Sequence, residues 1–153
     1  MKITDMLRQE FVLEELKARN KHDALAELAA VFAGGEIEVD PAAMLNVLLE
    51  RERLGSTGIG DGIAIPHGKV PGLDRIVVSF GRSRDGIQFE AMDGKPAHLF
   101  FLLMAPENST GLHLKALARI SRMLRDPGFR KDLLDAKKQE ELFGIIVKKD
   151  DEC

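Results

Sequence analysis

Apolar residues recur along the chain at helical spacing in two early segments. After Asn20, and again after Asp40–Pro41, they return every three or four positions, as expected for one buried helix face. The stripes are Ala24, Leu25, Leu28, Val31 and Phe32, then Met44, Leu45, Leu48 and Leu49. We predict a first helix that Asn20 caps and Gly34–Gly35 ends, and a second that runs from Asp40–Pro41 to the basic residues Arg51 and Arg53.

Shorter apolar runs predict strands. The runs are Phe11–Leu13, Ile63–Ile65, Ile76–Phe80, Ile87–Phe89 and Leu99–Met104. Asp85–Gly86 and Asp93–Gly94 lie between runs and predict turns. Leu99–Met104 is apolar at every position, which is typical of a strand covered on both faces. The sheet therefore needs helices on each side.

The last third of the chain is helical in pattern. A helix is predicted over Ser109–Arg125, where Leu117, Ile120 and Leu124 share a face, and Asp126–Pro127–Gly128 breaks it. Two shorter helical patterns follow, at Phe129–Leu134 and Glu140–Ile146. With no internal repeat, linker or low-complexity segment, residues 1–153 are expected to form one α/β domain, a mixed β-sheet flanked by helices on both faces.

Composition narrows the function classes. The formal net charge of −3 gives no basic stripe for nucleic acid, and no apolar run is long enough for membrane insertion. The N-terminus lacks a secretory signal, and the lone Cys153 follows three acidic residues, so a cytoplasmic location and an inert thiol are expected. The absence of Trp and Tyr weakens a sugar- or base-stacking role and favours histidine and carboxylate chemistry.

The segment Gly55–Lys69, GSTGIGDGIAIPHGK, is the main candidate for chemistry. It places His67 between Pro66, whose ring restricts the approach, and Gly68, which is expected to leave room beside the imidazole. We interpret His67 as a nucleophile presented to a partner.

The other histidines carry different expectations. His22 is expected to be solvated on the outer face of the first helix, and His98 to be a satisfied residue at the start of a buried strand. His113 precedes Leu117 by four positions, so a helix would turn it inward. It is either a structural residue that bonds a loop carbonyl or a second imidazole that faces His67.

Three rival chemistries fail on spacing. No HExxH, cysteine pair or close His-x-His accompanies the histidines, which argues against zinc. Gly58, Gly60 and Gly62 form GxGxG after a helix, not a dinucleotide or Walker motif, and predict a tight turn whose N–H groups could meet a transient anion. Ser56 and Ser79 lie in no GxSxG elbow of a serine hydrolase.

Three segments together resemble a known family. ERERLGSTGIGDGIAIPHGK, LMAPENSTGLHLKALARIS and DLLDAKKQEELFGII are similar to the enzyme IIA domain, fructose and mannitol class, of the bacterial phosphoenolpyruvate-dependent phosphotransferase system. The resemblance covers nearly the whole chain and is greatest to the nitrogen-regulatory members.

The resemblance implies roles for individual residues. His67 matches the phosphorylated histidine, which accepts phosphate from an HPr-like phosphocarrier. His113 matches a second active-site histidine, and Arg51 an arginine near the site. Neither a metal nor another cofactor is implied. Ser56, Thr57 and the amide of Gly58 are further candidates to bind the phosphoryl group. An ordinary alternative for Arg51 is a charge that stabilises a helix C-terminus.

Three functions follow as hypotheses. The first is a regulatory phosphoprotein whose phosphorylated and free forms bind different targets. The second is a fructose- or mannitol-specific enzyme IIA that passes phosphate to a separate enzyme IIB. The third is an unrelated histidine-dependent hydrolase or binding module.

Overall fold

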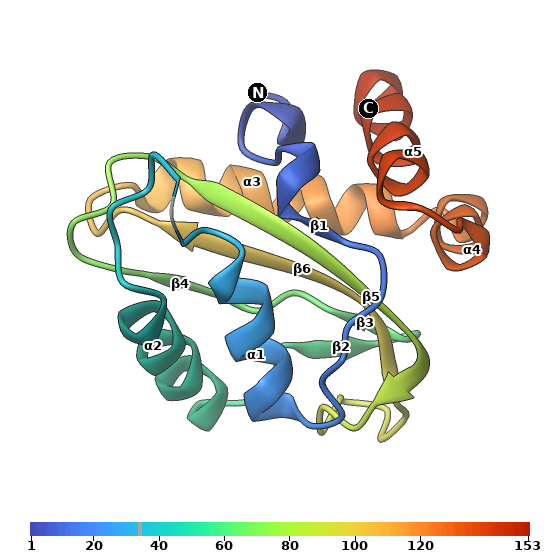
Figure 1. Cartoon of the computed structure of the whole chain (residues 1–153), viewed down its shortest axis with the longest axis horizontal. Coiled ribbons are helices and arrows are strands. Elements are labelled where there is room, and N and C mark those ends of the chain that lie inside the picture. The colour runs from blue at the N-terminus through green and yellow to red at the C-terminus, as the bar shows by residue number, and fades with distance from the viewer. Residues whose placement is uncertain (34) are drawn as a thin grey trace.

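A computed structural model describes residues 1–33 and 35–153, which form one α/β unit (Figure 1). The strands are β1 (Val12–Leu13), β2 (Gly58–Gly60), β3 (Ile63–Ala64), β4 (His67–Lys69), β5 (Val77–Ile87) and β6 (Ala97–Ala105). The helices are α1 (Lys21–Ala30), α2 (Pro41–Arg53), α3 (Thr110–Leu124), α4 (Pro127–Asp135) and α5 (Gln139–Glu152). None of these helices has the length and apolar character needed to cross a membrane.

All the strands belong to one mixed sheet, and β6 is at its centre. The order is β1-β5-β6-β3-β2, with β4 also paired to β6. β6 runs antiparallel to β5 and parallel to both β3 and β4. Eight of its nine residues are buried, as the uninterrupted apolar run predicts.

Helices cover both faces of the sheet, which confirms the predicted α/β layering. Ser79 of β5 donates a hydrogen bond to the Leu28 carbonyl of α1 at 2.9 Å, whereas Arg82 donates to the Leu133 carbonyl of α4 at 2.8 Å. Positions of opposite parity on a strand face opposite sides. Helices α1 and α4 therefore lie on different faces, and Figure 1 shows α2 grouped with α1, apart from α3, α4 and α5.

Side-chain caps begin the first two helices where the sequence predicts. Asn20 accepts the N–H of Asp23 at 2.8 Å, and Asp40 accepts the N–H of Ala42 at 3.0 Å. The first helix ends at Ala30, before the predicted stop at Gly34–Gly35, of which Gly34 lies outside the described residues. The predicted helix at Glu140–Ile146 is longer in the structure and reaches Glu152 as α5.

One predicted turn is wrong. Asp85–Gly86 does not reverse the chain, because β5 continues through it to Ile87. Gly86 has a φ of 85°, and the register shifts between Arg82 and Ile87, so β5 bulges and stays paired with β6. Asp93–Gly94 does form a turn. The short strands β2 and β4 were not predicted.

The close approach of α2 to the sheet depends on Gly68 in β4. A Cβ at this position would lie 2.6 Å from Cγ1 of Val47, a distance that side-chain atoms do not tolerate. The space beside Gly68 therefore belongs to α2. The expectation that it opens room beside His67 is wrong, because neighbouring strand residues face opposite ways.

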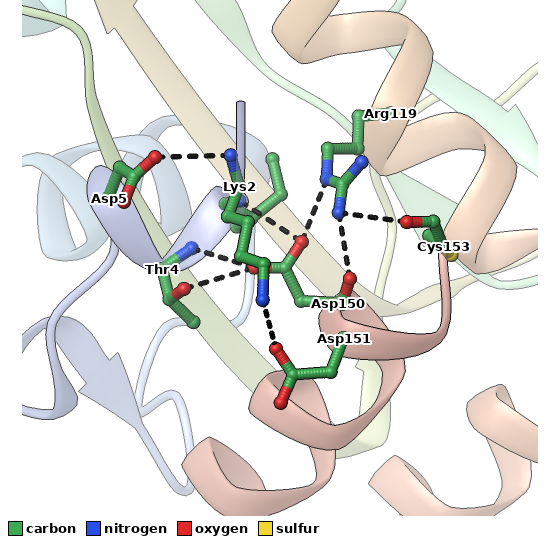
Figure 2. A network of polar contacts seen from close by, with 8 residues as sticks. Lys2, Thr4, Asp5, Arg119, Asp150, Asp151 and Cys153 are labelled. Carbon is green, nitrogen blue, oxygen red and sulfur yellow. Dashed lines mark hydrogen bonds and ion pairs between the residues drawn. The ribbon is translucent and has the colours of Figure 1, made fainter.

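A buried carboxylate ties the two ends of the chain together (Figure 2). Asp150 of α5 accepts hydrogen bonds from the N–H groups of Ile3 and Thr4 at 3.1 and 3.0 Å and from Arg119 Nε at 2.8 Å. Burial opposes the charged carboxylate, but these donors together hold the pKa of Asp150 below its usual value.

We expect Asp150→Asn to lower the free energy of unfolding by about 3 kcal/mol at neutral pH, because it leaves the Arg119 cation without its buried partner. Since the folded pKa is depressed, the wild-type contribution is complete above the unfolded value of about 3.9 and is lost as the pH falls through the folded pKa. Urea unfolding at several pH values measures both effects. The matched control is Asp151→Asn, at a side chain 58% exposed; equal losses in both variants would contradict the assignment.

Candidate functional site

Strand β4 directs His67 toward α3. Because Gly68 faces α2, the alternation of a strand turns His67 and Lys69 to the opposite side of the sheet. His67 lies opposite Leu103 in the parallel pairing with β6, so this pairing fixes the position of His67 along the central strand. The side chain of His67 is partly exposed.

A backbone carbonyl fixes the tautomer of His67. Nδ1 lies 2.7 Å from the carbonyl oxygen of Ile65. A carbonyl oxygen can only accept, so Nδ1 of a neutral ring must carry the hydrogen. The lone pair is then on Nε2, the atom available as a nucleophile.

His113 from the first turn of α3 meets His67 edge to face. The two ring centroids are 5.6 Å apart, and the rings are inclined at 71°. His113 is buried, and within the described part of the chain its Nε2 is the one buried side-chain nitrogen or oxygen that has no hydrogen-bond partner. A buried nitrogen of this kind calls for a hydrogen-bond partner. The arrangement therefore favours a site that is completed by a ligand.

Lys69 is a further candidate for the site, and the sequence did not indicate it. Its Nζ donates to Oγ1 of Thr110, at the start of α3, at 2.5 Å. Two positions after His67 on the same strand, Lys69 faces the same side. This spacing would have indicated Lys69 if the three residues of β4 had been recognised as a strand.

Arg51 lies in the last turn of α2 and holds the loop that follows. Its Nη1 donates to the Gly55 carbonyl at 3.0 Å. The guanidinium also acts on the His67 ring through its charge. Arg51 is thus a cation at a helix end, and its charge lowers the pKa of His67.

The site favours neutral imidazoles. Burial lowers the pKa of His67 most; the hydrogen bond to Ile65 opposes this, and the Arg51 cation lowers the pKa further. Burial is also the main reason that the pKa of His113 is lowered, and positive charge on His67 and on Lys69 lowers it further. Both shifts favour the neutral imidazole, the form that a nitrogen nucleophile requires.

The other loop candidates make internal contacts. The Ser56 hydroxyl donates to the Phe89 carbonyl at 2.9 Å and accepts the N–H of Gly58 at 3.0 Å. The Thr57 hydroxyl donates to the Glu52 carboxylate. These donors shape the loop, so their predicted role in phosphate binding receives no support from the geometry. His67, His113 and Arg51 carry the candidate site.

The remaining two histidines are satisfied elsewhere. Nδ1 of His98 lies 2.9 Å from the Ser83 carbonyl, and the exposed His22 lies 3.3 Å from Asp23. Across residues 1–33 and 35–153, no three His, Cys, Asp or Glu side chains are grouped to hold a metal ion.

Comparison with known proteins gives one consistent family. A family model described as "Phosphoenolpyruvate-dependent sugar phosphotransferase system, EIIA 2" matches residues 5–149. A nitrogen regulatory protein of Bradyrhizobium diazoefficiens is 46% identical over 149 residues, which cover 96% of this chain and 95% of that protein. The fructose-specific EIIABC component of Bacillus subtilis is 37% identical over 98% of this chain, which spans 24% of that longer protein.

The fold agrees with these sequences. The crystal structure of the nitrogen regulatory protein IIA-Ntr from Neisseria meningitidis superposes with a TM-score of 0.87 at 33% identity, over 94% of this chain and 98% of that one.

We expect Arg51→Gln to raise the pKa of His67, because it removes a cation that disfavours the charged ring. A reaction that needs neutral His67 loses activity on acidification, and in this variant the loss should begin at a higher pH than in the wild type. An NMR titration of the ring measures the shift. Arg53→Gln is the control, since that side chain is 73% exposed and pairs with Glu50; an unchanged His67 pKa in Arg51→Gln would refute the assignment.

Proposed function

We propose that this chain, which belongs to the EIIA 2 family of the phosphoenolpyruvate-dependent sugar phosphotransferase system, accepts a phosphoryl group on Nε2 of His67 and acts as a regulator. The donor is a phosphohistidine on an HPr-like phosphocarrier. The observation that carries the proposal is the bond from Nδ1 of His67 to the Ile65 carbonyl, which leaves Nε2 with the lone pair.

The transfer exchanges one nitrogen–phosphorus bond for another. The bond from phosphorus to the carrier imidazole breaks, its electron pair returns to the carrier ring, and the lone pair of His67 Nε2 forms the new bond. The His67 ring becomes more positive as it does so, and the Ile65 carbonyl stabilises that charge through Nδ1–H. The reaction needs no additional co-reactant.

Charge on the moving phosphoryl group is the main catalytic problem. In a loose transition state it is spread over three oxygens, and the protein must supply positioned donors and cations. His113 Nε2 can donate one hydrogen bond, and Arg51 can turn its guanidinium from the Gly55 carbonyl toward the group. Lys69, which points to the same side of β4 as His67, adds a second cation, and its charge acts on the His113 ring.

Exposed apolar side chains support a docking role around this site. Leu112 and Leu114 flank His113 in sequence and are 53% and 62% exposed. A phosphoryl group adds about −1.5 to −2 charges at pH 7, so its arrival changes which partner surfaces match. The phosphorylated and free proteins would then bind different targets, which is the basis of regulation.

Similarity to a fructose-specific EIIABC component favours a second candidate, in which His67 passes its phosphate to a separate enzyme IIB. Rapid transfer of label from the phosphorylated protein to a fructose-class enzyme IIB would support this function. The comparisons give no support to an unrelated hydrolase or binding module.

His67→Ala is expected to abolish labelling when the protein is incubated with phosphoenolpyruvate, enzyme I and an HPr-like carrier, because the only proposed acceptor nitrogen is lost. Acid-labile radiolabel on the intact protein measures the reaction. His98→Ala serves as a matched control, since that ring bonds the Ser83 carbonyl outside the site. If His67→Ala labels as fast as the wild type, the proposal is wrong.

His113→Ala is expected to slow phosphoryl exchange by on the order of 10²-fold, as for loss of one transition-state donor. The fold should persist, because Nε2 of this ring bonds no other side chain or backbone group that the structure describes. Rapid-quench kinetics and a thermal melt measure the two properties. Collapse of the thermal transition would support the structural role of His113 instead.

A further inference from the structure

Glu52 is an acidic residue in an unfavourable position. It lies in the last turn of α2, where the helix dipole disfavours negative charge. Its side chain is only 5% exposed, and burial of a carboxylate is costly without partners. The phosphoryl transfer described above does not use it, so its burial calls for a separate explanation.

Three donors from two other segments surround the carboxylate. Nζ of Lys21, at the start of α1, lies 3.0 Å away. The Thr57 N–H is 3.2 Å from each carboxylate oxygen, and the Thr57 hydroxyl also donates to the group. Lys21 stacks over the Phe89 ring at 4.9 Å, which holds the cation in place. Glu52 thereby joins α1, α2 and the loop before β2.

A continuous series of hydrogen bonds leads from Glu52 to His67. Glu52 holds the N–H of Thr57, and the Thr57 carbonyl accepts the N–H of Ile65 at 3.0 Å. The Ile65 carbonyl in turn accepts Nδ1–H of His67 at 2.7 Å. The carbonyl that selects the tautomer therefore belongs to Ile65, and Glu52 positions Ile65 through Thr57.

The same helix end also holds the other part of the loop. Arg51, the neighbour of Glu52, donates to the Gly55 carbonyl at 3.0 Å. Adjacent residues of α2 thus fix Gly55 and Thr57. A shift of Thr57 would move both the Arg51 contact and the carbonyl that orients His67.

We propose that Glu52, neutralised by Lys21, is a positioning residue for phosphoryl transfer: it fixes Thr57 and, through Ile65, keeps His67 in the tautomer whose Nε2 is the nucleophile. The inference rests on the proposed function, because it assigns a role in the reaction of His67. Glu52 touches neither the phosphoryl group nor the reacting nitrogens.

Glu52→Gln tests this role with a side chain of the same shape. The amide nitrogen must face a donor, either Lys21 or Thr57, so at least one contact is lost. We expect phosphoryl exchange to slow by about 10- to 100-fold, as when a reacting group is displaced by up to an ångström. In ¹⁵N spectra of labelled histidine, the fraction of His67 that carries hydrogen on Nδ1 should fall.

The control is Glu50→Gln on the same helix, where the side chain is 67% exposed and pairs with Arg53. It should keep the wild-type rate and tautomer. Thr57→Val is a second test, because it removes the hydroxyl contact and retains the pair of Glu52 with Lys21. It should show the same changes to a smaller degree, even if Glu52→Gln fails to fold.

The outcomes separate the two proposals. A folded Glu52→Gln or Thr57→Val with the wild-type tautomer and exchange rate overturns the positioning role, whatever its melting temperature. Labelling of wild-type His67 would leave the proposed function intact in that case. If wild-type protein does not label on His67, the proposed function fails first.

Discussion

The burial of β6 on both faces and along both edges is the constraint on which the rest of the structure depends. Its backbone pairs with β5 on one edge and with β3 and β4 on the other, and eight of its nine residues are buried. A strand that is apolar at every position from Leu99 to Met104 is stable only between two layers of helices. The site is a consequence, because β4 is registered against β6 and places His67 below the first turn of α3.

The helices could be predicted from sequence because local residues specify them. Asn20 and Asp40 cap their helices with side chains, and the spacing of apolar residues marks the buried faces. The strands were harder. β4 has only three residues, His67–Lys69, and its pairing with β6 is a long-range contact without a local pattern. At Gly86, a bulge and a turn call for the same residue type, so the sequence could not distinguish them.

The candidate site shows a similar division. His67 could be singled out from its motif, whereas the roles of His113 and Arg51 came from the resemblance to the enzyme IIA family. The tautomers and hydrogen-bond partners of the side chains could not be predicted. The tautomer of His67 depends on the Ile65 carbonyl. Every residue has such a carbonyl, so the sequence does not show which backbone group the ring will contact. The hydroxyls of Ser56 and Thr57 were plausible phosphate donors until the fold directed them to Phe89 and Glu52.

The absent side chain of Gly68 has an electrostatic consequence. Because Val47 occupies the space where a Cβ would be, α2 lies directly against β4, and the helix carries the Arg51 cation near the His67 ring. The repulsion between the Arg51 cation and a protonated His67 ring varies inversely with their separation and with the polarity of the medium between them. A methyl group at position 68 would act as a spacer, which would lengthen that separation and let water into the gap. The strength of the field at the nucleophile is thus set by a residue that has no charge and no side chain.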